Sequence, residues 1–90
     1  MSRVKVRLFA NIREIMGSAE ISLSARSIGE LLDLLVAMRP TLKDVLFDDN
    51  GLRPYITILV NRRNIRDVDG SRTQLAEGDE IAIFPPVSGG

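Results

Sequence analysis

Apolar and polar residues alternate near both ends of the chain, and this pattern predicts β-strands. Between residues 3 and 9, valine and leucine alternate with lysine and arginine, so one side of this strand is predicted to be buried. Shorter alternations cover residues 21–24 and 80–84. Residues 55–60 are nearly all apolar, which is typical of a central strand covered on parts of both faces. We also expect a very short strand at Ile65.

One main helix is predicted between the second and third strands. Ser27 and Glu30 form the S-x-x-E pattern of a capping box, in which each side chain bonds a free backbone N–H at the helix start. Pro40 ends the helix, because the residue before a proline disfavours helical geometry. Residues 42–47 predict a second, short helix, and residues 11–16 predict one helical turn. The apolar residues of the main helix recur at spacings of three and four: Ile28, Leu31, Leu32, Leu35 and Met38.

This order of elements predicts an α+β fold. Strands precede and follow the main helix, so neither an alternating parallel pattern nor an all-β pattern fits. We expect a mixed sheet of four to five strands, with the main helix across one face and a short second helix. Turns with positive φ are expected at Gly17, Gly51, Gly70 and Gly78. On the sheet, the predicted core consists of Val4, Val6, Leu8, Ile56, Ile58, Val60, Ile81 and Ile83.

Composition narrows the range of functions. The chain has 90 residues, which suits one domain, and its 12 basic and 12 acidic residues give no net charge. A neutral chain has no long-range field that would attract nucleic acid or a membrane surface. There is no cysteine and no histidine, so the usual thiol nucleophile, general base and metal ligands are missing. We therefore expect a protein that binds no metal or cofactor and is not catalytic alone.

Three further observations bear on location and metal binding. No apolar run approaches the roughly 18 residues of a membrane span. Residues 1–10 alternate in polarity, whereas a signal peptide needs a continuous apolar block, so we expect a cytoplasmic protein. The adjacent Asp48 and Asp49 are expected to form a turn, which is the commoner role of neighbouring carboxylates in a loop.

The end of the chain has an unusual composition: it reads Phe84-Pro85-Pro86-Val87-Ser88-Gly89-Gly90. The two prolines fix φ and favour extended geometry in the residue before each of them, so they stiffen the exit from the last strand. The two glycines fit a narrow slot because they lack side chains. When extended, residues 87–90 reach roughly 13–14 Å. We expect residues 1–84 to form the domain and residues 85–90 a flexible tail; the alternative is a frayed terminus without function.

These motifs resemble the MoaD group of the MoaD/ThiS sulfur-carrier family, which shares the ubiquitin-like β-grasp fold. The most specific likeness is Gly78-Asp79-Glu80-Ile81 followed by the C-terminal segment. One departure is Arg62-Arg63 after Asn61, where the family often has a glycine, so the geometry of this turn is expected to differ. Other matching stretches are Leu8-Phe9-Ala10 with Arg13-Glu14 and Gly17, the pair Leu31-Leu32, and Val60-Asn61.

The resemblance implies a sulfur carrier whose reactive group is the carboxylate of Gly90. At neutral pH a free carboxylate is an anion, and therefore a poor acyl electrophile. In the family, an E1-like adenylyltransferase of the MoeB type uses ATP to adenylate the terminal glycine, and a sulfur donor then converts it to a thiocarboxylate. In the MoaD group, the carrier docks on a MoaE-like large subunit, and the two form molybdopterin synthase in molybdenum cofactor biosynthesis. The residues expected to insert with Gly90 are Gly89, Ser88, Val87, Pro86 and Pro85.

The residues beside the tail are candidates for partner binding. Phe84 is expected on the opposite sheet face from its neighbour Ile83, and with Phe9, Leu59 and Ala82 it predicts an apolar strip away from the main helix. The alternative is that a loop or the short helix covers this strip. A solvated surface is expected for the basic residues nearby, which are Arg62, Arg63, Arg66 and Arg72.

Other functions stay open on the sequence alone. Small archaeal modifiers (SAMP) and Urm1-like proteins resemble the MoaD group, use the same E1 chemistry and form isopeptide bonds to lysines. Sulfur donation to thiamin thiazole or to tRNA is a third reading. A binding module without tail chemistry is a fourth, and removal of Gly89-Gly90 separates it from the others.

Overall fold

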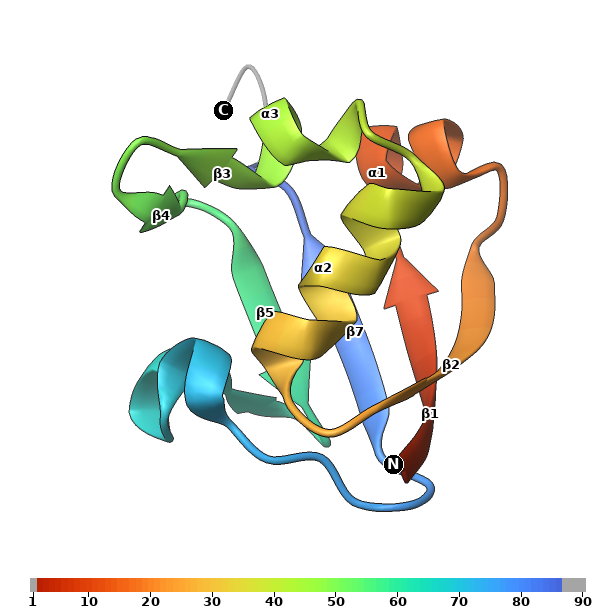
Figure 1. Cartoon of the computed structure of the whole chain (residues 1–90), viewed down its shortest axis with the longest axis vertical. Coiled ribbons are helices and arrows are strands. Elements are labelled where there is room, and N and C mark those ends of the chain that lie inside the picture. Colours follow the sequence, from red (N-terminus) through yellow and green to blue (C-terminus); the bar gives the residue numbers. More distant parts are fainter. Residues whose placement is uncertain (1, 87–90) are drawn as a thin grey trace.

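A mixed five-stranded sheet forms the centre of the computed structural model, which describes residues 2–86. Its strands are β1 (Ser2–Leu8), β2 (Glu20–Ala25), β5 (Thr57–Val60), β6 (Arg63–Asn64) and β7 (Glu80–Phe84). Their order is β2-β1-β7-β5-β6. β1 and β7 pair in parallel, whereas the β1–β2, β5–β7 and β5–β6 pairs are antiparallel (Figure 1). The predicted α+β class and mixed sheet are confirmed.

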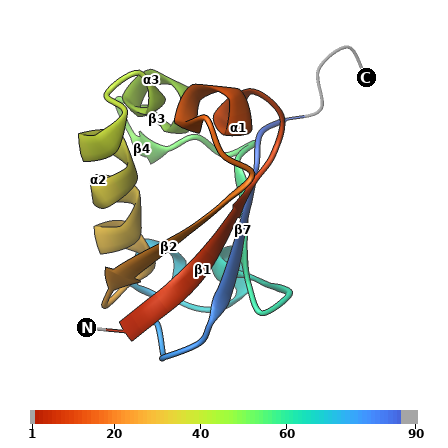
Figure 2. The same cartoon turned by 90° about the vertical axis from the view of Figure 1, so that its right-hand side faces the viewer.

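Within residues 2–86, three α-helices accompany the sheet: α1 (Ala10–Met16), α2 (Ile28–Met38) and α3 (Leu42–Leu46). In side view, α2 covers one face of the sheet, and α1 and α3 lie at the end where β1 and β7 finish (Figure 2). The opposite face of the sheet carries no helix among the described residues. The remaining elements are the small hairpin of β3 (Phe47–Asp48) and β4 (Gly51–Leu52), and two 3₁₀ helices at Ile65–Asp67 and Gly70–Arg72.

The hydrophobic core lies between α2 and the sheet. The three- and four-residue spacing of the apolar residues places them on one face of α2, and four of them are at most 1% exposed: Ile28, Leu31, Leu32 and Leu35. In the sheet, burial alternates along β1 and β7 as the sequence pattern requires. Each of the predicted sheet core residues is buried: Val4, Val6, Leu8, Ile56, Ile58, Val60, Ile81 and Ile83. The four predicted turn glycines have positive φ.

Two predicted elements differ from the structure. The strand predicted over residues 55–60 begins only at Thr57, because Arg53 to Ile56 form a turn in which the Ile56 N–H donates to the Arg53 carbonyl at 3.1 Å. Ile65 lies in a 3₁₀ helix, not in a strand. The side chain of Asn64 accepts a hydrogen bond from the Arg66 N–H at 2.9 Å, and this cap turns the chain out of the sheet.

The start of α2 follows the predicted capping box with one difference. The Ser27 hydroxyl accepts from the Glu30 N–H at 3.2 Å, as predicted. The Glu30 carboxylate accepts from the N–H of Arg26, one residue before the position expected for this motif, at 3.3 Å. The helix ends before Pro40, at Arg39, which has extended geometry.

Replacing Ser27 with alanine is expected to lower the free energy of unfolding by about 1 kcal/mol, because the first turn of α2 loses the acceptor for one free N–H. Chemical denaturation monitored by circular dichroism measures the change. Ser18→Ala is the matched control, since Ser18 is exposed and lies outside the helices and strands. Equal denaturant concentrations at the midpoint of unfolding for Ser27→Ala and Ser18→Ala would contradict the role of the cap.

Among residues 2–86, no helix is long and apolar enough to cross a bilayer. The longest helix in this range, α2, has 11 residues. The same part of the chain contains no group of three or more acidic, histidine or cysteine side chains that could hold a metal ion.

Candidate functional site

The sheet face opposite α2 carries the residues that were predicted to bind a partner. Strand β7 lies between β1 and β5, and its outward-facing Ala82 has Arg7 as its neighbour on β1 and Leu59 as its neighbour on β5. Two residues further along β7, Phe84 lies beside Thr57. The period of two along each strand places these side chains together on the outer face.

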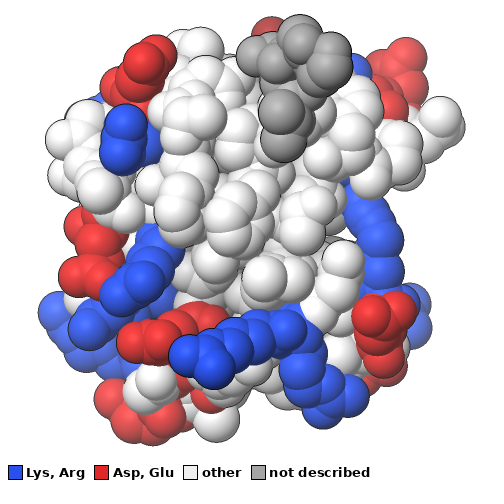
Figure 3. All heavy atoms as spheres, turned by 180° about the vertical axis from the view of Figure 1, so that it is seen from behind, with Lys and Arg blue, Asp and Glu red and all other residues white. Residues whose placement is uncertain are grey.

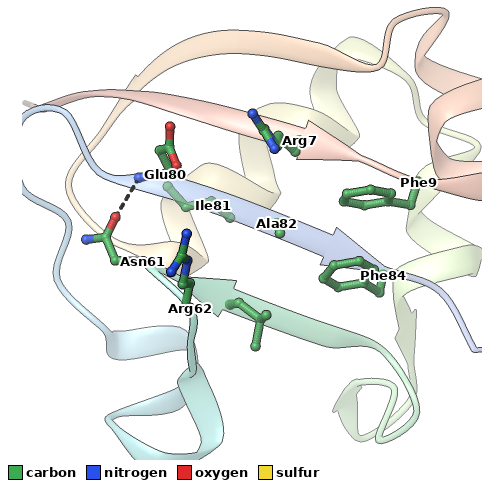
Figure 4. A pocket seen from close by; sticks show the side chains of 9 residues that line it. Arg7, Phe9, Asn61, Arg62, Glu80, Ile81, Ala82 and Phe84 are labelled. Carbon is green, nitrogen blue, oxygen red and sulfur yellow. Dashed lines mark hydrogen bonds between the residues drawn. The ribbon is translucent and has the colours of Figure 1, made fainter.

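The small side chain of Ala82 leaves a hollow in the middle of this face. The hollow has a volume of about 380 Å³. Its lining consists of Arg7, Phe9, Leu59, Asn61, Arg62, Glu80, Ile81, Ala82 and Phe84. Figure 4 shows Ala82 at the centre, with the two phenyl rings at one end, Asn61, Arg62 and Glu80 at the other, and Arg7 on the strand beside Ala82. The apolar strip predicted from Phe9, Leu59, Ala82 and Phe84 is therefore assembled as expected.

Phe9 and Phe84 form the wall of the hollow at the end nearest the tail. Their rings are stacked, with centroids 4.3 Å apart and planes inclined by 14°. Both side chains are half-buried, so they keep an apolar surface open to solvent. Seen from behind, this face is largely uncharged, with acidic and basic side chains gathered at its margins (Figure 3). Neither α3 nor any other described element covers the strip, contrary to the alternative considered from the sequence.

Asn61 forms the far end of the hollow and is tied to the start of β7. Its side-chain nitrogen donates to Asp79 Oδ1 at 2.8 Å, and its side-chain oxygen accepts from the Glu80 N–H at 3.0 Å. The Asn61 N–H donates to the Glu80 carbonyl at 2.8 Å. The other oxygen of Asp79 accepts from the Ala76 N–H at 2.8 Å. These bonds fix the turn between β5 and β6 against the adjoining strand.

The turn itself contains two residues with left-handed geometry. Asn61 has φ +49° and Arg62 has φ +74°, between the paired residues Val60 and Arg63. Two-residue hairpin turns of this kind favour glycine at the second position. Left-handed geometry costs a residue with a side chain roughly 1–2 kcal/mol, and asparagine tolerates it better than arginine does. The turn therefore has the left-handed geometry that suits a glycine at its second position, and the expected difference in geometry is not found; the strain falls on Arg62.

Two of the arginines have roles that the sequence did not reveal. Arg66 was predicted to be merely solvated, but its guanidinium donates to the carbonyls of Arg53 and Ile56, each at 3.1 Å, and so holds the turn before β5. Arg7 forms an exposed ion pair with Glu20 at 3.6 Å, beside the hollow. The described residues around the hollow offer apolar contact and charge.

The tail begins where the hollow ends. Phe84 is the last residue of β7, Pro85 is half-buried and Pro86 is exposed. The other residues predicted to insert into a partner lie outside the described residues: Val87, Ser88, Gly89 and Gly90. Because Phe84 lines the hollow and precedes the tail directly, a protein docked on the hollow would also lie next to the start of the tail.

Comparison with known proteins gives a consistent picture. A model of the ThiS family matches residues 6–90. Small archaeal modifier protein 3 of Haloferax volcanii is 33% identical over 90 residues, covering 97% of this chain and 98% of the relative. The molybdopterin synthase sulfur carrier subunit of Arabidopsis thaliana is 32% identical over 90 residues, covering 97% of this chain and 82% of the relative.

Comparison with solved structures also finds a small archaeal modifier protein. The solution structure of small archaeal modifier protein 1 from Methanosarcina acetivorans superimposes with a TM-score of 0.90 at 43% identity, covering all of this chain and 98% of the other. The predicted ubiquitin-like β-grasp fold is confirmed by this likeness together with the five-stranded sheet.

Proposed function

We propose, from the premise that this chain belongs to the ThiS family of sulfur carriers and ubiquitin-like small modifiers, that it carries sulfur on the carboxylate of Gly90. The observation that carries the proposal is that the family match runs through residue 90 and so includes the Phe-Pro-Pro-Val-Ser-Gly-Gly segment. The carrier would serve as the small subunit of molybdopterin synthase, the role named for the Arabidopsis relative.

The proposed chemistry needs a separate enzyme. A carboxylate oxygen of Gly90 attacks the α-phosphorus of ATP, and pyrophosphate leaves. The resulting acyl-adenylate is an electrophile, so a sulfur nucleophile can attack its carbonyl carbon and displace AMP. This chain has no cysteine or histidine, and thus neither the usual sulfur nucleophile nor the usual general base. An E1-like adenylyltransferase, a sulfur donor and a MoaE-like large subunit are therefore the proposed partners.

The surface beside the tail supports this division of labour. The stacked rings of Phe9 and Phe84, with Leu59 and Ala82, give a partner an apolar area to bury next to the first residues of the tail. Docking there would place Pro85 and Pro86 at the edge of the interface. Because proline restricts its own φ and the geometry of the residue before it, little conformational entropy would be lost when a partner holds Pro85 and Pro86.

A second candidate function rests on equally direct likeness. Small archaeal modifier proteins are among the matches both by sequence and by structure. A modifier would use the same adenylate, but the amine of a lysine would attack the acyl carbon in place of sulfur. The products are an isopeptide bond and AMP, so the two functions share the activation step and differ in the nucleophile. Use in tRNA thiolation, proposed with the modifier reading, would again require sulfur on Gly90.

Mass spectrometry of the protein isolated from its own cells is expected to separate these functions. As a carrier, a fraction of the chain will have one sulfur in place of one oxygen, and the change will map to the peptide that contains Gly90. Growth that demands molybdenum cofactor should raise this fraction. The carrier function is refuted when no such species forms in cells that make the cofactor.

Conjugates of this chain to lysines have to be identified by a long tryptic remnant, because the chain has neither lysine nor arginine after Arg72. Trypsin will therefore leave residues 73–90 on a modified lysine, not the Gly-Gly remnant known from shorter tryptic ends. Lys5 and Lys43 are the two lysines of the chain. A variant with both replaced by arginine keeps the charge and removes self-conjugation, so every remnant found with it lies on another protein. Remnants at several lysines would favour the modifier; none under several growth conditions would count against it.

A further inference from the structure

Arg62 occupies a position where its backbone is strained and a glycine would fit better. Its φ of +74° lies in the left-handed region, in the two-residue turn between Val60 and Arg63. Residues held in such conformations cluster at functional sites, where the surrounding structure imposes the geometry. Here the bonds from Asn61 to Asp79 and Glu80 impose it. The geometry of the turn therefore gives no reason for an arginine at this position.

The side chain of Arg62 lines the hollow above Ala82. Figure 4 shows Arg62 at the polar end of the hollow, opposite the two phenyl rings. The other arginine that lines the hollow, Arg7, pairs with Glu20. Within residues 2–86, the Arg62 guanidinium makes neither a hydrogen bond nor an ion pair. It remains available to bind a group from outside.

We propose that Arg62 is a specificity-determining residue that binds a carboxylate of the activating enzyme, while an apolar side chain of that enzyme enters the hollow above Ala82. This inference rests on the proposed function, because it names the chemistry of the partner at the same surface. The occupant is a protein segment in which an aliphatic or aromatic residue stands next to an aspartate or glutamate. Arginine suits this contact, since its planar guanidinium binds a carboxylate through two parallel hydrogen bonds.

The unpaired arginine at the hollow can attract an acidic group. Of the two arginines that line it, Arg7 pairs with Glu20, whereas Arg62 has no ion-pair partner among residues 2–86. The turn carrying Arg62 is fixed by the Asn61 bonds, so little backbone freedom is lost when the guanidinium binds. Continuity with the tail supports the same occupant, because Phe84 both lines the hollow and precedes Pro85. An activating enzyme that receives the tail and covers the hollow would therefore also reach Arg62 at its other end.

Substitution of Arg62 by glycine tests the proposal, because it removes the charge and relieves the strain. The variant is expected to have a higher melting temperature than the wild type and a Kd for the activating enzyme about 10-fold weaker. Loss of fold cannot produce this combination. Arg62→Lys should retain part of the affinity, since it keeps the charge without the planar group. Arg63→Gln is the matched control: it removes an equal charge from the next residue, which is exposed and does not line the hollow.

The probe is the E1-like adenylating enzyme purified from the same organism, with binding measured by calorimetry at low and high salt. The wild-type Kd should rise with salt, and the Arg62→Gly Kd should rise less, because an attractive charge pair has been removed. Equal Kd values for wild type and Arg62→Gly, or an equal loss in Arg63→Gln, would overturn the inference while the carrier function stands. Absence of wild-type adenylation in an ATP–pyrophosphate exchange assay would instead refute the proposed function and this inference with it.

Discussion

Deletion of Gly90 is expected to reduce adenylation by well over 100-fold and to leave the fold unchanged. The shortened chain still ends in a glycine carboxylate, that of Gly89, so the chemistry of the reacting group is preserved. Its position is not: one residue of extended chain spans roughly 3.3–3.6 Å. A displacement of about 1 Å at a reacting centre can already cost about 100-fold in rate. ATP–pyrophosphate exchange with the activating enzyme measures the effect.

The experiment includes two controls. Thermal unfolding of the deletion variant should match that of the wild type, because the sheet ends at Phe84, well before the deleted residue. Ser18→Ala, an exposed change outside the helices and strands, should be adenylated at the wild-type rate. Full adenylation of the deletion variant would show that the reacting carboxylate is not positioned by the length of the tail. Full cellular function after removal of Gly89-Gly90 would favour a binding module without tail chemistry.

Replacement of Ala82 by leucine is expected to weaken binding to the activating enzyme by about 100-fold. Ala82 lies at the centre of the hollow, and the larger side chain would fill the space that a partner side chain needs. The residue faces outward from β7, so the core of the domain is not disturbed. Surface substitutions of this kind usually change the free energy of unfolding by no more than about 0.5 kcal/mol. Calorimetric titration and chemical denaturation together measure the two effects.

Ala82→Ser is the matched control for the leucine variant. Serine is nearly the size of alanine, so it keeps the hollow open and should bind within about 3-fold of the wild type, a difference of less than 1 kcal/mol. Equal affinity of all three proteins would show that no partner side chain enters the hollow. Equal weakening in the serine and leucine variants would show that polarity, and not volume, governs this surface.

The sequence predicted most of the fold because its strongest signals are periodic. The spacing of apolar residues from Ile28 to Leu35 places them on one face of α2. The alternation along β1 likewise places its apolar residues on one face, and both faces are buried in the structure. The same alternation predicted the outer strip of Phe9, Leu59 and Phe84. Ile65 was assigned wrongly, since an apolar residue between polar neighbours is compatible with a strand. The Asn64 side-chain cap that produces a 3₁₀ helix has no periodic signal.

The shape and charge of the hollow were harder to predict from the sequence than the fold was. A hollow depends on a small residue surrounded by larger ones from three strands, and the pairing of Arg7 and Leu59 with Ala82 follows only from the strand order. Arg62 was expected on a solvated surface because arginine is usually found there. The available signal was the missing glycine after Asn61, which pointed to an altered turn but not to the side chain it presents.

The parallel pairing of β1 and β7 has a mechanical consequence. Both edges of β7 are paired, to β1 over Glu80 to Ile83 and to β5 over Ile81 to Phe84. Because β1 and β7 run in the same direction, the N-terminus and the exit to the tail lie at opposite ends of the sheet. A force that draws the tail outward along β7 would have to shear several hydrogen bonds on both edges at once, not peel them one by one. The pairing on both edges would therefore hold β7 in the sheet against a pull along its length.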